Sequence, residues 1–519
     1  MIAVGQKRSS RCHLVSGNGR SGYYATLSHC WGDPHNRPLS TTDQTLPSRQ
    51  RGIEDEALPK TFRHAVHVCR ELGIEYIWID SLCIIQEQET QEDWAKEAPR
   101  MGLVYGNSTL NISAAAAADS TQGCFRERLG LITWPCPIML FEKACCLSRY
   151  PVWREEHMGD PGDAEHSGDI DQDFSNVLAR RAWVLQEQVL SRRSIIFAEK
   201  RLIWRCPTLL TNEKYPLGIP RAPDISPDNR RLLHCILNGI TSFIPEEPAV
   251  DIYTCWYRTV VEFTSRNLTY EQDRLPAISG IAKRFGTAVN DNYHAGLWRK
   301  DMVFGLLWYV IREEVECTSN LARAPSWSWA SVNGEVYYFL VSLDGYTNRT
   351  SLYPLVDILD VSDPTTCKDH PFGVTSSASL SLSGVLLAEL QDEHVNSGLV
   401  LIRNGIRFAD FGILTSHFWD PDGPEEAPLT YLPVCVYYGY TPEGTEGNGG
   451  LNKISWERSM ETEAGEFKSR GMLPCLVLQA IEGSQDTYRR VGLCDVRGRG
   501  IIEISRMALF GERRSITLI

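Results

Sequence analysis

Polar and titratable side chains gather where two short strand-like runs of this 519-residue sequence end. The run YATLSH (24–29) has Ser28 near its end and is followed by a turn-prone segment that contains Trp31. The apolar run IEYIWI (74–79) is followed at once by Asp80. Open α/β sheets bind ligands at the carboxyl ends of their strands, so a hydroxyl, an indole and a carboxylate at these places favour a binding site. Asp80 can equally cap a turn, and Trp31 can equally pack in a core.

Three other patterns have residue types that could form a reactive or binding site, but their surroundings in the sequence argue against one. Cys30 follows His29, yet neighbouring residues of a strand point to opposite faces, so we do not expect a thiolate–imidazole pair. His64 and His67 are three residues apart on one expected helix. Two ligands without a third nearby make a poor metal site, and we predict no metal. The glycines of GNGRSG (17–22) precede a strand, which indicates a turn and not a dinucleotide fingerprint.

The elements around these residues alternate between helix and strand. A helix is predicted over residues 58–73, because one apolar face recurs at helical spacing and a proline and a glycine stand at its two ends. That face consists of Phe62, Ala65, Val66, Cys69 and Leu72. The run 74–79 is too apolar for an edge strand and predicts a buried one. Another helix is expected from Asp93, where Pro99 shortens or kinks it.

Further along the chain the pattern changes twice. A third strand begins at Thr109, the stretch 151–176 is acidic and reads as a solvated loop, and residues 178–206 indicate a helix followed by a hairpin. Alternating strands and turns dominate the last third of the chain. We therefore predict an α/β domain, then a mainly helical region, then a β-rich C-terminal region, at residues 1–210, 211–320 and 321–519.

Composition restricts the class of protein. The chain has 52 Lys and Arg against 65 Asp and Glu, a net charge of −13, which argues against nucleic-acid binding through bulk electrostatics. Its 16 cysteines are scattered, as expected for reduced thiols in a cytoplasmic protein. The N-terminus lacks the apolar segment of a signal peptide, and no apolar stretch is long enough to span a bilayer. We therefore expect a soluble, cytoplasmic protein with no membrane span.

Several blocks of the sequence together resemble the HET (heterokaryon incompatibility) domain of filamentous fungi. Three blocks carry most of the likeness: YATLSHCWG (24–32), the stretch from LPKTF to WIDSLCIIQ (58–86), and RAWVLQE (181–187). Their order and spacing match the family, and the resemblance covers roughly residues 1–210. The later segment DRLPAISG (273–280) resembles a region that often follows the domain.

The resemblance implies a role in non-self recognition, in which incompatible cell fusion leads to growth arrest and programmed cell death. HET domains have been related to the TIR fold, a flavodoxin-like α/β domain of which some members cleave NAD. In that fold a tryptophan in the nucleotide cleft lies a few residues before a catalytic glutamate, and Trp183 and Glu187 match this pattern. The resemblance thus implies Glu187 as the catalytic residue and Trp183 as a substrate-binding residue. Ser28, Trp31 and Asp80, at the ends of their strands, are the other substrate-binding residues that we predict. It implies NAD as a substrate, no bound cofactor, and an incompatibility protein or a second copy of the chain as the partner.

Two alternatives remain open. Glu187 can be a glutamate on a helix surface that pairs with one of its neighbouring arginines, Arg180, Arg181 or Arg192. The whole domain can also be a non-catalytic interaction module that signals through a protein partner. Departures from the family pattern favour this second class of function, and they fall at Ala182, Gln188 and Arg205.

Overall fold

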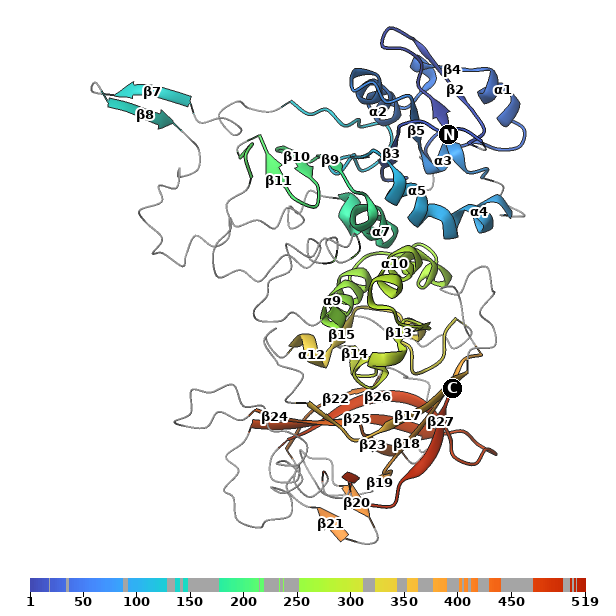
Figure 1. The fold of residues 1–519 in the computed structure, drawn as a ribbon, viewed down its shortest axis with the longest axis vertical. Helices are drawn as coiled ribbons and strands as arrows, with labels where there is room; N and C mark the ends of the chain where they lie inside the picture. Colours follow the sequence, from blue (N-terminus) through green and yellow to red (C-terminus); the bar gives the residue numbers. More distant parts are fainter. Residues whose placement is uncertain are drawn as a thin grey trace. The chain divides into compact units, whose positions relative to one another are not determined.

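The chain divides into two compact units (Figure 1). The first comprises Met1–Phe243, Arg266–Leu268 and Ala277–Ile281, and the second comprises Ile244–Ser265, Thr269–Pro276 and Ala282–Ile519. The computed structural model describes residues 1–17, 19–33, 37–86, 92–127, 136–140, 143–147, 177–213, 215–218, 233, 237, 252–310, 323–342, 352–362, 377–389, 401–403, 406–408, 412–418, 429–439, 470–497, 505, 508–509 and 511–519. The acidic stretch 151–176, predicted as a loop, lies outside these residues.

A nine-stranded sheet forms the framework of the first unit, with the strand order β11-β10-β9-β6-β3-β5-β1-β2-β4. Its strands are β1 (Ile2–Ala3), β2 (Arg11–Leu14), β3 (Tyr24–Ser28), β4 (Ile53–Glu54), β5 (Tyr76–Trp78), β6 (Leu110–Ser113), β9 (Ser194–Phe197), β10 (Leu202–Arg205) and β11 (Leu210–Asn212). A separate hairpin is formed by β7 (Cys136–Leu140) and β8 (Lys143–Leu147). The strands predicted from residues 24, 74 and 109 are all present, as β3, β5 and β6. As predicted, β5 is an interior strand.

Four strands at the centre of this sheet, β5, β3, β6 and β9, run parallel to one another. The second of them in sequence, β5, lies on one side of β3, and the third, β6, lies on the other side. This is the beginning of the doubly wound order 2-1-3-4-5, which is found in flavodoxin-like sheets. The winding therefore reverses between β3 and β6. The carboxyl ends of these two strands form a topological switch point, which is where open α/β sheets bind ligands.

Helices cover both faces of the sheet (Figure 1). They are α1 (Leu46–Arg51), α2 (Lys60–Glu71), α3 (Asp80–Cys83), α4 (Glu92–Glu97), α5 (Met101–Asn107) and α7 (Ala182–Leu190). The helix α2 packs on one face, while α5 and α7 contact each other on the opposite face. Pro99 lies in a 3₁₀ turn, Ala98–Arg100, between α4 and α5, so the predicted interruption is confirmed. The helix and hairpin predicted over residues 178–206 are α7, β9 and β10.

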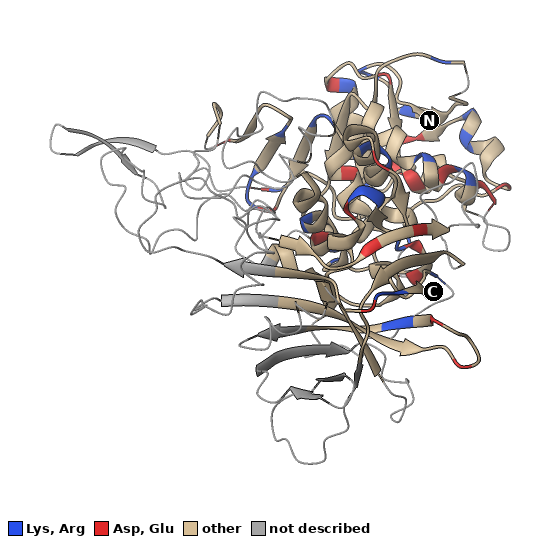
Figure 2. Ribbon diagram, turned by 60° about the horizontal axis from the view of Figure 1, so that its bottom comes forward, with Lys and Arg blue, Asp and Glu red and all other residues tan. Residues whose placement is uncertain are grey.

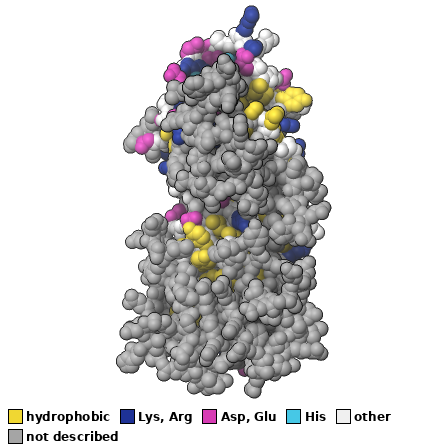
Figure 3. Space-filling model, turned by 90° about the vertical axis from the view of Figure 1, so that its left-hand side faces the viewer, with side chains coloured by type: hydrophobic (Ala, Val, Ile, Leu, Met, Phe, Trp, Pro, Cys, Tyr) yellow, Lys and Arg dark blue, Asp and Glu magenta, His cyan; other side chains and the backbone are white. Residues whose placement is uncertain are grey.

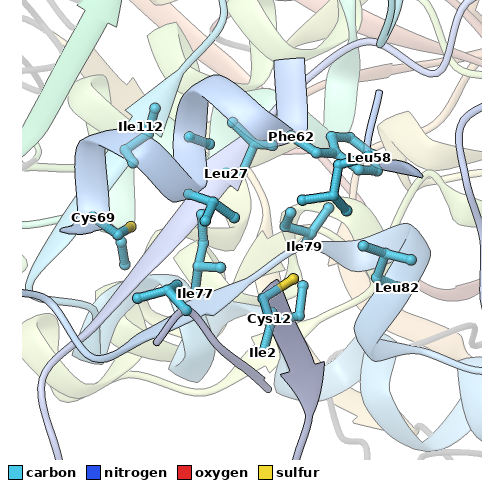
Figure 4. Close-up of a cluster of buried hydrophobic side chains, with 14 of the residues drawn as sticks. Ile2, Cys12, Leu27, Leu58, Phe62, Cys69, Ile77, Ile79, Leu82 and Ile112 are labelled. Atoms are coloured by element: carbon cyan, nitrogen blue, oxygen red, sulfur yellow. The ribbon is translucent and has the colours of Figure 1, made fainter. Parts of the chain in front are cut away.

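The main core of the first unit lies between α2 and the sheet (Figure 4). Four of the five residues predicted to form the apolar face of α2 are buried in it, Phe62, Ala65, Val66 and Cys69. They pack against Leu27, Ile77 and Ile112 from three parallel strands. The prediction is wrong for the fifth residue, Leu72, which lies just beyond the last turn and is 58% exposed. Gly73 follows with φ +69°, a left-handed conformation that favours glycine and ends the helix.

A buried arginine joins α2 to the edge of the sheet. The guanidinium of Arg70 donates to the carbonyl of Val4 (2.7 Å) and, through both terminal nitrogens, to the carboxylate of Asp55. Its Nη2 lies 3.0 Å from Asp55 Oδ1. Both side chains are mostly buried, so each charge depends on the other for compensation.

The second unit combines helices with a large, mainly antiparallel sheet. Its helical part contains α9 (Ile252–Thr264), α10 (Ser279–Val289, which begins within the first unit), α11 (Met302–Gly305) and α12 (Phe339–Ser342). The small strand pairs are β12 (Tyr293–His294) with β13 (Leu297–Trp298) and β14 (Trp308–Val310) with β15 (Val336–Tyr338). Buried tryptophans pack this part, among them Trp256, Trp298, Trp308, Trp327 and Trp329.

The twelve-stranded sheet of the second unit is centred on a long hairpin, β25 with β26. Its strands are β16 (Leu352–Pro354), β17 (Asp357–Ser362), β18 (Ser379–Gly384), β19 (Leu387–Glu389), β20 (Leu401–Arg403), β21 (Ile406–Phe408), β22 (Gly412–Phe418), β23 (Leu429–Pro433), β24 (Cys435–Gly439), β25 (Arg470–Ala480), β26 (Thr487–Arg497) and β27 (Arg514–Leu518). The predicted sequence of an α/β part, a helical part and a β-rich part is confirmed. The boundaries at residues 210 and 320 stay predictions.

Charges of both signs are distributed over the described elements. Lysine and arginine residues are interspersed with aspartate and glutamate residues over the described ribbon (Figure 2). On the face shown in Figure 3, the described part of the surface carries acidic, basic and hydrophobic side chains side by side. Among the described residues, no helix has both the length and the apolar character needed to cross a bilayer.

Candidate functional site

A stripe of polar side chains runs across the centre of the sheet. Strands β3 and β6 are in register, with Thr26 opposite Asn111 and Ser28 opposite Ser113. Because alternate residues of a strand point to opposite faces, these four side chains share one face of the sheet. The residues between them are apolar and belong to the core under α2. All four residues of this polar stripe are buried.

Hydrogen bonds satisfy only part of the polar stripe. The amide oxygen of Asn111 accepts from the hydroxyls of Thr26 (3.0 Å) and Ser28 (3.2 Å). The amide nitrogen of Asn111 and the hydroxyl of Ser113 have no hydrogen-bond partner within the described part of the chain. Buried polar groups in folded proteins are nearly always paired, so two such atoms on one strand, β6, mark this place as unusual.

Glu187 lies on α7 and faces the polar stripe. Its carboxyl interacts with the hydroxyls of Ser28, from β3, and Tyr105, from α5. The side chain is buried, with 6% of the residue exposed, and its Oε2 has no hydrogen-bond partner among the residues described. The alternative of a surface glutamate paired with an arginine is therefore wrong, because α7 buries Glu187 between itself and the sheet.

The environment of Glu187 favours its protonated form. Burial raises the pKa of Glu187 from its ordinary value of 4.5 to about 7. The Ser28 hydroxyl and the positive charge of Arg181 lower this pKa, the negative charge of Asp80 raises it, and the Tyr105 hydroxyl lowers it. The result is a carboxyl that exchanges its proton near neutral pH, as general acids, bases and electrostatic stabilisers at enzyme sites often do.

Two later segments of the chain hold α7 in place. On one side of Glu187, the Gln186 Oε1 accepts from the backbone N–H of Gly280 (2.7 Å). On the other side, the Gln188 Oε1 accepts from Arg266 Nη2 (3.2 Å). Both segments belong to the same compact unit as α7. Gln188, one of the departures from the family pattern, is thus a buried hydrogen-bonding residue.

Asp80 and Trp31 are hydrogen-bonded to each other. The indole N–H of Trp31 donates to Asp80 Oδ2 (2.7 Å), and the other carboxylate oxygen accepts from the backbone N–H of Ser81 (2.7 Å). Asp80 therefore fixes the start of α3 and also orients Trp31. His29 Nδ1 lies 3.6 Å from Asp80 Oδ1, and burial lowers the pKa of His29, which favours the neutral ring.

Trp183 lies on the same helix as Glu187 but contacts a different neighbour. It is half-buried and packs edge-on against Trp94 of α4, with ring centroids 6.3 Å apart. It also packs against the small cluster that contains Trp78 and Tyr105. The structure thus brings Glu187 and Ser28 into contact and places Asp80 near enough to affect the Glu187 charge.

The other candidates have structural roles. Burial raises the pKa of the Cys30 thiol to about 11, which disfavours a nucleophilic thiolate, and Cys30 packs with Val184. His64 Nδ1 accepts from the backbone N–H groups of Cys124 (3.1 Å) and Phe125 (3.3 Å). Within the described ranges no group of three or more His, Cys, Asp or Glu side chains could hold a metal ion.

Three residues of the site were not singled out for a role from the sequence, namely Tyr105, Asn111 and Ser113. A signal for two of them exists. Strands expected to be buried on both faces normally consist of apolar residues throughout. In YATLS (24–28) and LNIS (110–113), a polar residue instead recurs at every second position. This period of two predicts one polar face on a buried sheet, which is the polar stripe.

Comparison with known proteins gives one match. Residues 24–187 match the family model described as heterokaryon incompatibility protein (HET). The match begins at the first residue of β3 and ends at Glu187, so it includes the polar stripe and most of α7. No curated protein and no solved structure matches the chain.

Proposed function

Starting from the heterokaryon incompatibility domain at residues 24–187, we propose that this protein is an effector of fungal non-self recognition that hydrolyses NAD at Glu187. The family match supports the function in heterokaryon incompatibility. The NAD chemistry rests on one observation in particular: a buried carboxyl with an unpartnered oxygen among the described residues faces a polar stripe at the switch point of the sheet. Growth arrest or cell death would follow from loss of the nucleotide.

The reaction needs a carboxylate more than it needs a nucleophile. The bond between the nicotinamide nitrogen and the ribose carbon breaks, and its electron pair leaves with nicotinamide, which becomes neutral. The positive charge that develops on the ribose is captured by water, which loses a proton and gives ADP-ribose. A carboxylate beside the ribose stabilises this charge and orients the hydroxyls. Glu187 is the described acidic side chain that faces the polar stripe.

The raised pKa of Glu187 is compatible with this task. With a pKa of about 7, a substantial fraction of the carboxyl is ionised at neutral pH. The nicotinamide ring of NAD is cationic, and an opposite charge nearby favours the ionised form. Substrate binding would therefore help to produce the carboxylate that the transition state requires. Asp80 would orient Trp31 as a stacking surface.

The buried position of Glu187 also suggests how activity is controlled. With 6% of the residue exposed, NAD reaches the carboxyl only if α7 or its neighbours move. We expect the isolated chain to have low activity and self-association to raise it, as suits an enzyme that would otherwise deplete its own cell of NAD. Trp183, on the half-buried side of α7, would then become available to stack on the nucleotide.

The test is NAD consumption by purified protein at increasing protein concentration. Wild type is compared with Glu187→Gln, which keeps the shape of the side chain, and with Glu199→Gln, which removes an exposed glutamate paired with Arg126. We expect cleavage by wild type and by Glu199→Gln, with a loss of at least about 100-fold in Glu187→Gln. Equal cleavage by all three would remove Glu187 from catalysis.

A non-catalytic interaction module is the second candidate. The observation that favours it is the packing of α7, whose residues from Val184 to Leu190 are all buried and whose two glutamines are hydrogen-bonded. In this case the protein acts through a partner or a second copy of the chain. No NAD would be consumed by any of the three proteins, and Glu187→Gln would leave the incompatibility phenotype intact.

A further inference from the structure

Three buried polar atoms with no partner among the described residues belong to the layer between the sheet and α7. They are the amide nitrogen of Asn111, the hydroxyl oxygen of Ser113 and Oε2 of Glu187. Asn111 and Ser113 are at most 1% exposed. Leaving a buried polar group unpaired destabilises a protein more than replacing it by an apolar one, so a purely structural layer would gain from alanine at such positions.

The chemistry of these atoms is complementary to a pair of neighbouring hydroxyls. An amide nitrogen donates, a serine hydroxyl both donates and accepts, and a carboxylate oxygen accepts. A ribose presents two adjacent hydroxyls, each of which donates one hydrogen bond and accepts others. A phosphate would require donors or cations throughout, whereas Glu187 presents a carboxyl to the same layer and would repel an anion when ionised.

We propose that Asn111 and Ser113 bind the ribose hydroxyls of a ribosyl nucleotide, alongside Glu187. The inference rests on the proposed function for the identity of the nucleotide, and it adds the two residues that select the sugar. Asn111 is well placed for this role because Thr26 and Ser28 fix its amide oxygen (3.0 and 3.2 Å), which leaves the amide nitrogen as the free donor. Ser113 lies one pleat further toward the carboxyl edge, in register with Ser28.

The inference is tested by measuring ligand affinity and thermal stability together in the full-length chain. The probe is ADP-ribose, which keeps both hydroxyls and is not consumed. It is titrated by calorimetry into wild type and Ser113→Ala at the highest protein concentration of the NAD assay, where self-association opens the site. We expect Ser113→Ala to bind ADP-ribose about tenfold more weakly. We also expect its melting temperature to rise by about 2 °C or more, because an unpaired buried hydroxyl is removed.

A matched control is Ser331→Ala in the second unit. Ser331 is also buried, but its hydroxyl donates to the carbonyl of Ser328 (2.7 Å). Its replacement should lower the melting temperature and leave the affinity for ADP-ribose unchanged. A second variant, Asn111→Asp, keeps an oxygen for Thr26 and Ser28 but replaces the free donor, and we expect it to bind ADP-ribose at least tenfold more weakly.

The outcomes separate this inference from the proposed function. If wild type binds ADP-ribose and both stripe variants lose affinity, the inference holds, whether or not NAD is cleaved. If wild type cleaves NAD and the variants bind ADP-ribose as tightly as wild type, the proposed NAD cleavage is supported and the inference about Asn111 and Ser113 is overturned. If wild type does not bind ADP-ribose at millimolar concentration, water alone satisfies the polar stripe, and the inference is likewise overturned.

Discussion

Replacing Glu187 by glutamine should change how the stability of the first unit depends on pH. A carboxyl whose pKa is higher in the folded than in the unfolded protein holds its proton more tightly when folded. Its contribution to stability is present in full below pH 4.5 and is lost as the pH rises through about 7. Glutamine keeps the size of the side chain and cannot ionise, so the variant should lack this loss.

The magnitude follows from the two pKa values. A pKa that moves from 4.5 to about 7 corresponds to about 3 kcal/mol, and the side chain is too deeply buried for solvent to screen much of it. Between pH 4.5 and pH 8, wild type should therefore lose about 3 kcal/mol of stability relative to Glu187→Gln. Other titrating groups act on both proteins equally and cancel in the difference.

Hydrogen exchange provides an assay that is specific to the first unit. Exchange protection is measured in peptides that cover β3 and β6, at each pH, for wild type and variant under identical conditions. Glu199→Gln serves as the control, because Glu199 is half exposed and its pair with Arg126 is screened by solvent. If the difference between wild type and Glu187→Gln is the same at pH 4.5 and pH 8, the reasoning about the buried carboxyl is refuted.

Three further predictions concern activity and packing. In wild type, kcat/KM for NAD should rise with pH through about 7, because the reaction needs the ionised form of Glu187, and a flat profile would contradict this. Arg70→Met should lower the free energy of unfolding by about 3 kcal/mol, measured by urea titration, since it leaves the carboxylate of Asp55 unpaired. Gly280→Ala should reduce NAD cleavage several-fold in a steady-state assay. Its Cβ would lie 2.9 Å from the backbone Cα of Gly102 on α5 as well as 2.5 Å from Gln186 Oε1, so the segment could not keep its place against α5 and α7. Unchanged turnover would contradict this.

Periodicity was sufficient to predict the apolar half of the first unit. The spacing of Phe62 and Val66 identifies the buried face of α2, and the run 74–79 identifies an interior strand, because both signals arise from residues close in sequence. Leu72 continues the helical spacing but lies beyond the last helical turn, at the glycine that ends α2. The spacing of apolar residues alone does not show at which residue the helix ends and its side chains are no longer buried.

The polar half of the site depended on contacts that no local pattern shows. Glu187 and Ser28 are far apart in sequence and meet because the third crossover returns α7 over β3. The sequence around Glu187 does not predict whether its carboxyl is buried or exposed, because arginines flank it on both sides. The alternation in β3 and β6 was visible, but its meaning required the knowledge that these strands are neighbours in register.

The way in which α7 is held shows that the structural support of this helix extends beyond the family match. The match ends at Glu187, yet the glutamines on both sides of that residue are bound by Arg266 and Gly280. The backbone at the start of α7 is also bound by one of these segments: the N–H of Ala182 donates to the carbonyl of Asn267 (3.0 Å). Without these segments, two buried side-chain oxygens and the first N–H of α7 would lose their partners, each at a cost of about 1–3 kcal/mol. A signal that moves Arg266–Leu268 or Ala277–Ile281 would therefore act directly on the helix that carries Glu187.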